Sequence, residues 1–149
     1  MWGFITTIFT NKIVISVIIS YLLASIIKVF FNYLAYDEWD FMVFFRTGGM
    51  PSSHTATVSA MTASIYFLEG FSNLFFISLI ISSIIVSDAV GIRRAAGKQA
   101  YVLNKMVEEF KYFKKFRTKR LYELLGHTPK QALAGLVLGI LVAKFVFSF

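Results

Sequence analysis

Cysteine is absent from this sequence of 149 residues, and proline and histidine each occur only twice. Without cysteine, the chain has no disulfides and no thiolate metal site. The two histidines show neither the HExxH nor the HxH spacing of common zinc sites, which argues against a bound metal. Charged residues are also scarce, at 15% of the chain, and only 8 of them are acidic. The few rare residues are therefore the best guide to any chemistry.

Apolar residues are abundant. They make up 57% of the chain, and the mean hydropathy is +0.69, well above the balance of a typical soluble domain. The sequence therefore predicts an integral membrane protein, and its length favours one domain over residues 1–149. The net charge of +7 also occurs in nucleic-acid-binding proteins. Here the basic residues adjoin apolar segments, so membrane topology and anionic lipids explain them better, and we expect no nucleic-acid partner.

Four apolar segments are long enough to cross a bilayer, for which about 20 residues are needed. They are residues 13–36, 53–68, 74–90 and 129–149. The second is rich in Ala, Ser and Thr, and small residues let helices pack closely in lipid, so we expect it at the centre. Gly135 and Gly139 form a GxxxG pair of the same kind. These patterns predict an all-α, polytopic membrane bundle of about four transmembrane helices.

One further segment has a different period. In residues 99–116 the apolar side chains recur at helical spacing between charged ones: Leu103, Met106, Val107, Phe110 and Phe113. This is typical of an amphipathic helix, and beside membrane spans we expect it to lie in the interface. Residues 111–120 add six basic residues. Such a run is usually a solvated cytoplasmic face and only secondarily a patch for lipid headgroups.

Topology decides which polar groups can meet. With four spans, the connections 36–52 and 91–128 lie on the same side of the membrane, and they contain most of the 15 Lys and Arg residues. The positive-inside rule makes that side cytoplasmic. We therefore expect a multi-pass protein of the cell membrane whose candidate site faces the cytoplasmic leaflet. The polar residues brought to that leaflet are His54, Asp88, Arg93, Arg94 and His127, with Lys28 just below them.

Two short stretches hold both histidines. Residues 48–57 read GGMPSSHTAT, and residues 126–135 read GHTPKQALAG. In each, proline and hydroxyl-bearing residues, which are favoured at helix starts, lead into an apolar run. Both histidines therefore lie at predicted helix N-termini, where free N–H groups and the helix dipole attract anions. One such stretch is as often a plain helix start, but two that hold every histidine favour one shared site.

The chemistry of this group suits a phosphate carried by a lipid. Cationic side chains, hydroxyls and N–H groups can bind its oxygens, and the candidates are Lys28, Arg46, Ser52, Ser53, Arg93, Arg94 and Gln131. One neutral histidine can attack phosphorus while the other protonates the leaving oxygen, without a metal or other cofactor. Lys28 has a simpler alternative, since a lysine near a helix end can reach the interface. Asp88 is the only acid of its helix, and we expect it to be buried against Lys28, an arginine or a histidine.

The motifs GGMPSSHTA, DAVGIRRAAGKQA and GHTPKQALAG together resemble the type 2 phosphatidic acid phosphatase and vanadium haloperoxidase superfamily, in particular its small divergent membrane branch. The resemblance implies that His127 is the nucleophile and His54 the acid. It also implies that Lys28 and Arg46 match the lysine and arginine of the first family motif, with Lys28 the better placed.

The chain departs from the family pattern at several points. PSGH reads PSSH, the arginine–proline pair of the first motif and the serine–arginine of the third are missing, and Gln131 stands where the family has an aspartate. Asp88 is then the candidate for the missing carboxylate, and Arg93 or Arg94 for the missing guanidinium.

These observations lead to one main function and two alternatives. The main one is a membrane phosphatase that acts on a lipid phosphate or diphosphate through a phosphohistidine. The first alternative is a binder or transporter of lipid phosphates that kept the anion site and lost the chemistry. The second is a structural membrane protein whose basic segment only sets topology. Four helices are few for enclosing a site, which is compatible with a homodimer.

Overall fold

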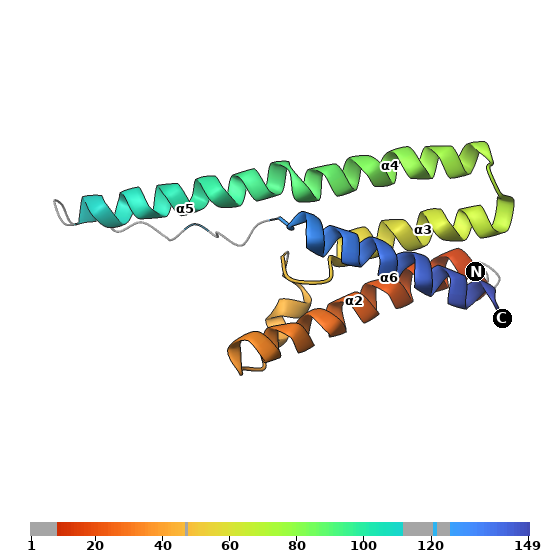
Figure 1. Ribbon diagram of the computed structural model, residues 1–149, viewed down its shortest axis with the longest axis horizontal. Coiled ribbons are helices and arrows are strands. Elements are labelled where there is room, and N and C mark those ends of the chain that lie inside the picture. The colour runs from red at the N-terminus through yellow and green to blue at the C-terminus, as the bar shows by residue number, and fades with distance from the viewer. Residues whose placement is uncertain (1–8, 47, 112–120, 122–125) are drawn as a thin grey trace, which may run out of the picture.

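The computed structural model describes residues 9–46, 48–111, 121 and 126–149 (Figure 1). Every regular element in these residues is helical, which confirms the all-α class. In chain order the elements are α2 (Lys12–Tyr36), the 3₁₀ helix η1 (Phe41–Phe44), α3 (Ser53–Glu69), α4 (Asn73–Val90), α5 (Ile92–Lys111) and α6 (Pro129–Phe147).

Three helical stretches of the described chain are long and apolar enough to cross a membrane. They are α2, the stretch Asn73–Glu109 that contains α4, and α6. Helix α3, the fourth expected span, has 17 residues and a length of about 25 Å, near the lower limit for a span. It packs against α2, α4 and α6, so its small polar residues face neighbouring helices. The predicted central position of this helix is confirmed.

The closest packing joins α3 to α6. A side chain at Gly135 would collide with the Ser52 carbonyl oxygen, and one at Gly139 would collide with the Ala56 carbonyl oxygen and approach the Ala60 nitrogen to 2.8 Å. The two glycines therefore let the α6 backbone lie directly on α3. The predicted GxxxG contact is confirmed, and its partner is α3.

Hydroxyl groups join α3 to α4. The Thr62 and Ser82 hydroxyls lie 2.8 Å apart, and Ser82 Oγ donates to the Val58 carbonyl at 3.3 Å. A hydroxyl that bonds to a neighbouring helix removes an unpaired polar group from an apolar environment. Within the described residues, α2 and α4 flank α3 without contacting each other.

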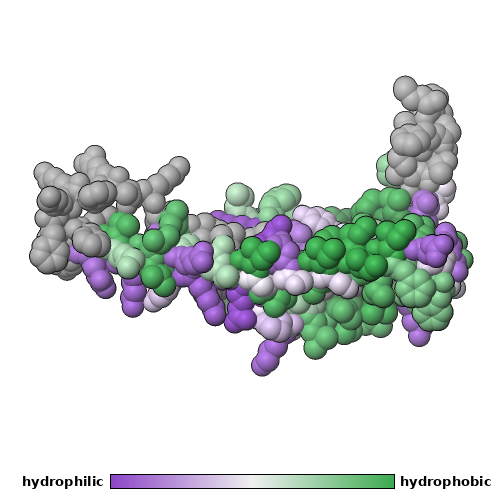
Figure 2. All heavy atoms as spheres, turned by 90° about the horizontal axis from the view of Figure 1, so that it is seen from above, coloured by the Kyte–Doolittle hydropathy of each residue, from purple (hydrophilic) through white to green (hydrophobic). Residues whose placement is uncertain are grey.

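The predicted amphipathic helix is present as α5, and it begins earlier than expected, at Ile92. The α4 helix ends with Gly91 as its C-cap, and α5 continues nearly in line beyond the bundle of α2, α3 and α6 (Figure 1). On the surface, hydrophobic side chains cover the α4 half, and hydrophilic ones appear where α5 starts (Figure 2). Residues 112–116 of the predicted helix and nearly all of the basic run lie outside the described residues. An interfacial location for α5 stays a prediction.

The glycine contact between α3 and α6 gives a stability prediction. We expect Gly139→Ala to destabilise the protein by about 1 to 3 kcal/mol, because the added methyl overpacks a tight backbone contact. Val137→Ile adds one carbon on the exposed face of the same helix and is the control. Thermal unfolding in detergent measures both variants, and equal melting temperatures would contradict the close contact.

Candidate functional site

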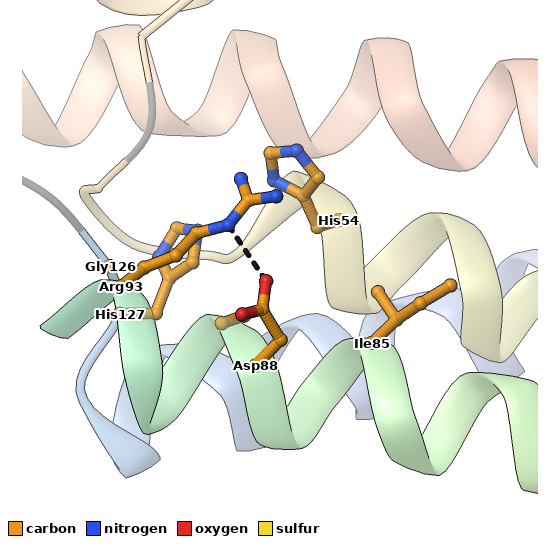
Figure 3. A pocket seen from close by; sticks show the side chains of 7 residues that line it. His54, Ile85, Asp88, Arg93, Gly126 and His127 are labelled. Atoms are coloured by element: carbon orange, nitrogen blue, oxygen red, sulfur yellow. Dashed lines mark hydrogen bonds and ion pairs between the residues drawn. The ribbon is translucent and has the colours of Figure 1, made fainter.

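One end of the bundle carries a small pocket where α3 and α6 begin and α4 ends (Figure 3). Its lining residues are His54, Ile85, Asp88, Ala89, Arg93, Gly126 and His127. The two histidine rings lie side by side, with 6.1 Å between their centroids. The two histidine stretches, 78 residues apart at their first glycines, therefore meet at one pocket.

The backbone holds His127 in place. Its N–H donates to the Ala89 carbonyl near the end of α4, at 2.9 Å. Gly126, with φ +83°, packs so closely on Arg94 that a side chain there would collide with the Arg94 backbone. Only glycine combines this positive φ with such a close approach. His127 is thus tied to the end of α4 immediately before α6 begins.

The imidazole of His127 itself has no such ties. The residue is 2% exposed, and neither ring nitrogen makes a hydrogen bond to any described residue. A buried polar group without a partner is unfavourable by about 1 to 3 kcal/mol. Such a group is a reason to expect a ligand or a reaction at that position. Both nitrogens remain available to a molecule that enters the pocket.

Burial lowers the pKa of His127 below its ordinary value, and the positive charges of His54 and Lys28 lower it further. Acceptor groups of Gly49 and Gln131 near the ring oppose this shift in part. The ring is therefore neutral at pH 7, the form in which a ring nitrogen has a free lone pair.

The side chain of Gln131 takes part in capping the start of α6. The Thr128 N–H donates to Gln131 Oε1 at 2.9 Å, and the Gln131 N–H donates to Thr128 Oγ1 at 3.3 Å. This is a capping box, which satisfies two N–H groups at the helix start. Gln131 does not line the pocket. Its amide oxygen caps the helix start, and the same side chain lies near the His127 ring and raises the pKa of that ring.

The side chain of Ser52 caps the start of α3. Its hydroxyl oxygen is the N-cap and accepts hydrogen bonds from the Thr55 N–H and the Thr55 hydroxyl. Its own N–H donates to the Gln131 carbonyl at 3.0 Å, which joins the starts of α3 and α6. Ser52 and Ser53 are both buried and neither lines the pocket. They support His54, which is in the first turn and faces the pocket.

Asp88 pairs with Arg93, and Arg93 Nε donates to Asp88 Oδ2 at 2.8 Å. The expected cation partner is thus confirmed, but the expected burial is wrong, since the two side chains are 35% and 47% exposed. An ion pair this exposed contributes at most about 1 kcal/mol to stability. Its role is better seen in Figure 3, where the Arg93 guanidinium extends beside the His54 ring. Asp88 therefore orients a cation toward the pocket.

Lys28 lies beneath the loop that precedes α3. It is 2% exposed, and its ammonium donates to the Arg46 carbonyl at 3.0 Å. A side chain at Gly49 would lie 2.8 Å from Lys28 Cγ, so the loop covers the lysine stem closely. The lysine is therefore covered by protein and bonded to the loop, and its position relative to the membrane interface stays a prediction. Lys28 supplies a buried positive charge behind the histidines.

Two candidate phosphate ligands lie elsewhere. The Arg46 guanidinium is bonded to Asp40 at 2.8 Å, and Arg94 contributes its backbone to the packing of Gly126. Neither lines the pocket. Sequence reasoning missed Ile85 and Ala89, although Ile85 precedes Asp88 by three residues and so shares its helix face. In the part of the chain that the structure describes, no three His, Asp or Glu residues are placed to hold a metal ion.

The neutral ring of His127 gives a pH prediction. Because its pKa in the folded protein lies below the ordinary value of about 6.5, the unfolded chain binds more protons in that range and stability falls as the pH drops. We expect the His127 imidazole signal in ¹⁵N NMR, identified as the signal that His127→Ala removes, to titrate below pH 6.5. A His127 signal that titrates at or above the ordinary value would contradict the buried, unpaired ring.

Comparison with known proteins adds independent information. The model of the divergent PAP2 family matches residues 9–142. The uncharacterized membrane protein YuiD of Bacillus subtilis (strain 168) is 37% identical over 152 residues, an alignment that covers 94% of this chain and 96% of YuiD. No solved structure matches the chain. The family match spans all the residues of the pocket, and the chain therefore belongs to the divergent PAP2 family of membrane proteins.

Proposed function

We propose that this protein hydrolyses a lipid phosphate or diphosphate through a phosphohistidine intermediate. The observation that carries the proposal is the buried imidazole of His127, in which neither nitrogen has a hydrogen-bond partner among the described residues. The centroid of this ring lies 6.1 Å from the centroid of the His54 ring. A histidine that must attack phosphorus needs a free lone pair and a neutral ring. Membership in the divergent PAP2 family supports a phosphatase-related role.

In the first step a ring nitrogen of His127 attacks phosphorus and forms a P–N bond. The bond between phosphorus and the leaving oxygen breaks, and protonated His54 gives that oxygen its proton. In the second step water attacks the phosphohistidine, neutral His54 accepts a proton from the water, and the P–N bond breaks. Inorganic phosphate leaves and His127 is restored.

The charge that develops on the phosphoryl oxygens meets positive groups. The Arg93 guanidinium beside His54 can donate hydrogen bonds to them, and buried Lys28 supplies a second charge from behind the pocket. The starts of α3 and α6 add the positive ends of two helix dipoles. Such fixed groups stabilise a transition state without reorganisation during the reaction.

The position of the pocket favours a substrate in the membrane. It lies at one end of apolar helices, at the level where lipid headgroups are expected, and Ile85 gives it an apolar wall. The basic residues of the connections support a position of this end in the cytoplasmic leaflet of the cell membrane.

A second function is favoured by one observation. Among the described residues, Asp88 supplies the one carboxylate that lines the pocket. This carboxylate is bonded to Arg93, so no described carboxylate orients the His127 ring. A site of this kind can bind a lipid phosphate without hydrolysing it. Headgroup-dependent binding without turnover in the wild-type protein would favour this binder or transporter.

The two histidines have separate expected effects. We expect His127→Ala to abolish both turnover and the acid-labile phosphoenzyme, because the nucleophile is lost. His54→Ala should slow turnover by about 10²- to 10⁴-fold, the usual contribution of a general acid. An activated aryl phosphate, whose leaving group needs no proton, should recover part of that loss. Phosphate release and trapped ³²P-phosphoenzyme from purified protein measure these effects.

A matched pair of cations controls this experiment. We expect vanadate to inhibit the wild type, because it can occupy the anion site in a pentacoordinate form like that of the reacting phosphate. Arg93→Ala removes a cation from the pocket and should weaken this inhibition, whereas Lys98→Ala removes an exposed cation of α5 and should not. A phosphoenzyme that persists in His127→Ala would show that the nucleophile is misassigned.

The proposed orientation can be tested by labelling. We expect single cysteines at Ser148 to react with an impermeant reagent outside intact cells, and cysteines at Lys98 to be protected, because the basic connections face the cytoplasm. Labelling at Lys98 without labelling at Ser148 would reverse the orientation. The natural absence of cysteine makes the unmodified chain the blank.

A further inference from the structure

We propose that Asn104, on the outlying helix α5, is a positioning residue for His127, and that it acts by holding Leu121, six residues before this histidine in the chain. The placement of His127 is independent of the proposed reaction. Only the kinetic part of the test rests on the proposed function.

Asn104 makes a paired contact with the backbone of Leu121. Its Nδ2 donates to the Leu121 carbonyl at 2.8 Å, and its Oδ1 accepts from the Leu121 N–H at 2.9 Å. The side-chain amide thus pairs with both polar groups of one residue, as a neighbouring strand would. Asn104 is 7% exposed. Asparagine is a poor helix former, so this contact, rather than the helix, explains its presence in α5.

The face of α5 around Asn104 is buried. Gly97 and Ala100 are buried on the same face as Asn104, at the spacing of neighbouring helix turns. Further toward the start of α5, Gly126 packs directly on the Arg94 backbone. Leu121 and Gly126, which both precede His127 in the chain, therefore each contact α5.

The separation of these two points links them mechanically. Arg94 and Asn104 are ten residues apart in α5, or about 15 Å along its axis. Leu121 and Gly126 are five residues apart, and such a link reaches at most about 17 Å. If Leu121 leaves its place on α5, Gly126 loses one of the two anchors that set its position. His127 follows Gly126 directly.

The ring of His127 cannot compensate for such a loss, because neither nitrogen has a hydrogen-bond partner among the described residues. The backbone bond to Ala89 and the packing of Gly126 are then what place the ring. A shift of about 1 Å in a reacting group can cost about 100-fold in rate. The effect of Asn104 should therefore appear in the rate of the chemical step more than in substrate binding.

The test compares three variants of the full-length protein in detergent. Asn104→Ala removes both hydrogen bonds to Leu121, and Asn104→Asp keeps an acceptor for the Leu121 N–H. Gln99→Ala changes an exposed residue of the same helix and is the control. The first readout is the ¹⁵N NMR titration of the two imidazoles, in which the groups around His127 are His54, Lys28 and the Asp88–Arg93 pair.

We expect the His127 signal of Asn104→Ala to titrate closer to its ordinary value, because the ring becomes more hydrated, while the His54 signal moves less. We also expect kcat to fall by about 10- to 100-fold with KM nearly constant, and Asn104→Asp to show a smaller change in both readouts. Gln99→Ala should match the wild type. If Asn104→Ala does not fold, the same two measurements on Asn104→Asp decide the proposal.

Each outcome separates the two proposals. An unchanged His127 titration and kcat in both Asn104 variants overturns the role of Asn104 while the proposed reaction stands. A lower melting temperature in both Asn104 variants, with an unchanged titration of the His127 signal, also overturns the role of Asn104. In that case Asn104 only stabilises α5. Absence of turnover in the wild type overturns the phosphatase, and the NMR titration still decides on Asn104.

Discussion

The close contact of α3 with α6 is the constraint on which the rest of the structure depends. Two glycines of α6 lie against carbonyl groups of α3, and at the same end the Ser52 N–H donates to the Gln131 carbonyl. Two helix N-termini are thereby held side by side in an apolar bundle. Each carries its histidine at or just before the first turn. A wider spacing of the helices would separate the rings, whatever the local sequence around each histidine.

The site combines firmly held backbones with side chains that are left free. His127 is placed by its own N–H and by the packing of Gly126, while its ring has no partner in the described chain. Leaving a buried imidazole unpaired is unfavourable, and helix packing elsewhere in the bundle offsets it. The same logic applies to Arg93, because Asp88 engages its Nε and leaves the outer nitrogens of the guanidinium to the pocket. Such arrangements are found where a protein must respond to a ligand.

The fold was largely predictable because its signals are local. Apolar segments of sufficient length, capping residues and a GxxxG pair all act within a few residues of each other, and the helices follow them. The central place of α3 could be inferred from its small residues, although 17 residues make it a marginal span. The burial of Asp88 was predicted wrongly, because an acid in an apolar helix can lie at its end, where water reaches it.

By itself the sequence determined the helices, their membrane class and the pairing of the two histidine stretches, since periodicity, hydropathy and caps depend on neighbours along the chain. Only the tertiary structure decided the partners of individual side chains. It buried the Lys28 side chain beneath a loop, paired the Thr62 hydroxyl with that of Ser82, and placed the His54 ring beside that of His127. These contacts join residues from different helices and loops, and their geometry depends on how whole helices pack. No pattern within a single segment contains that information.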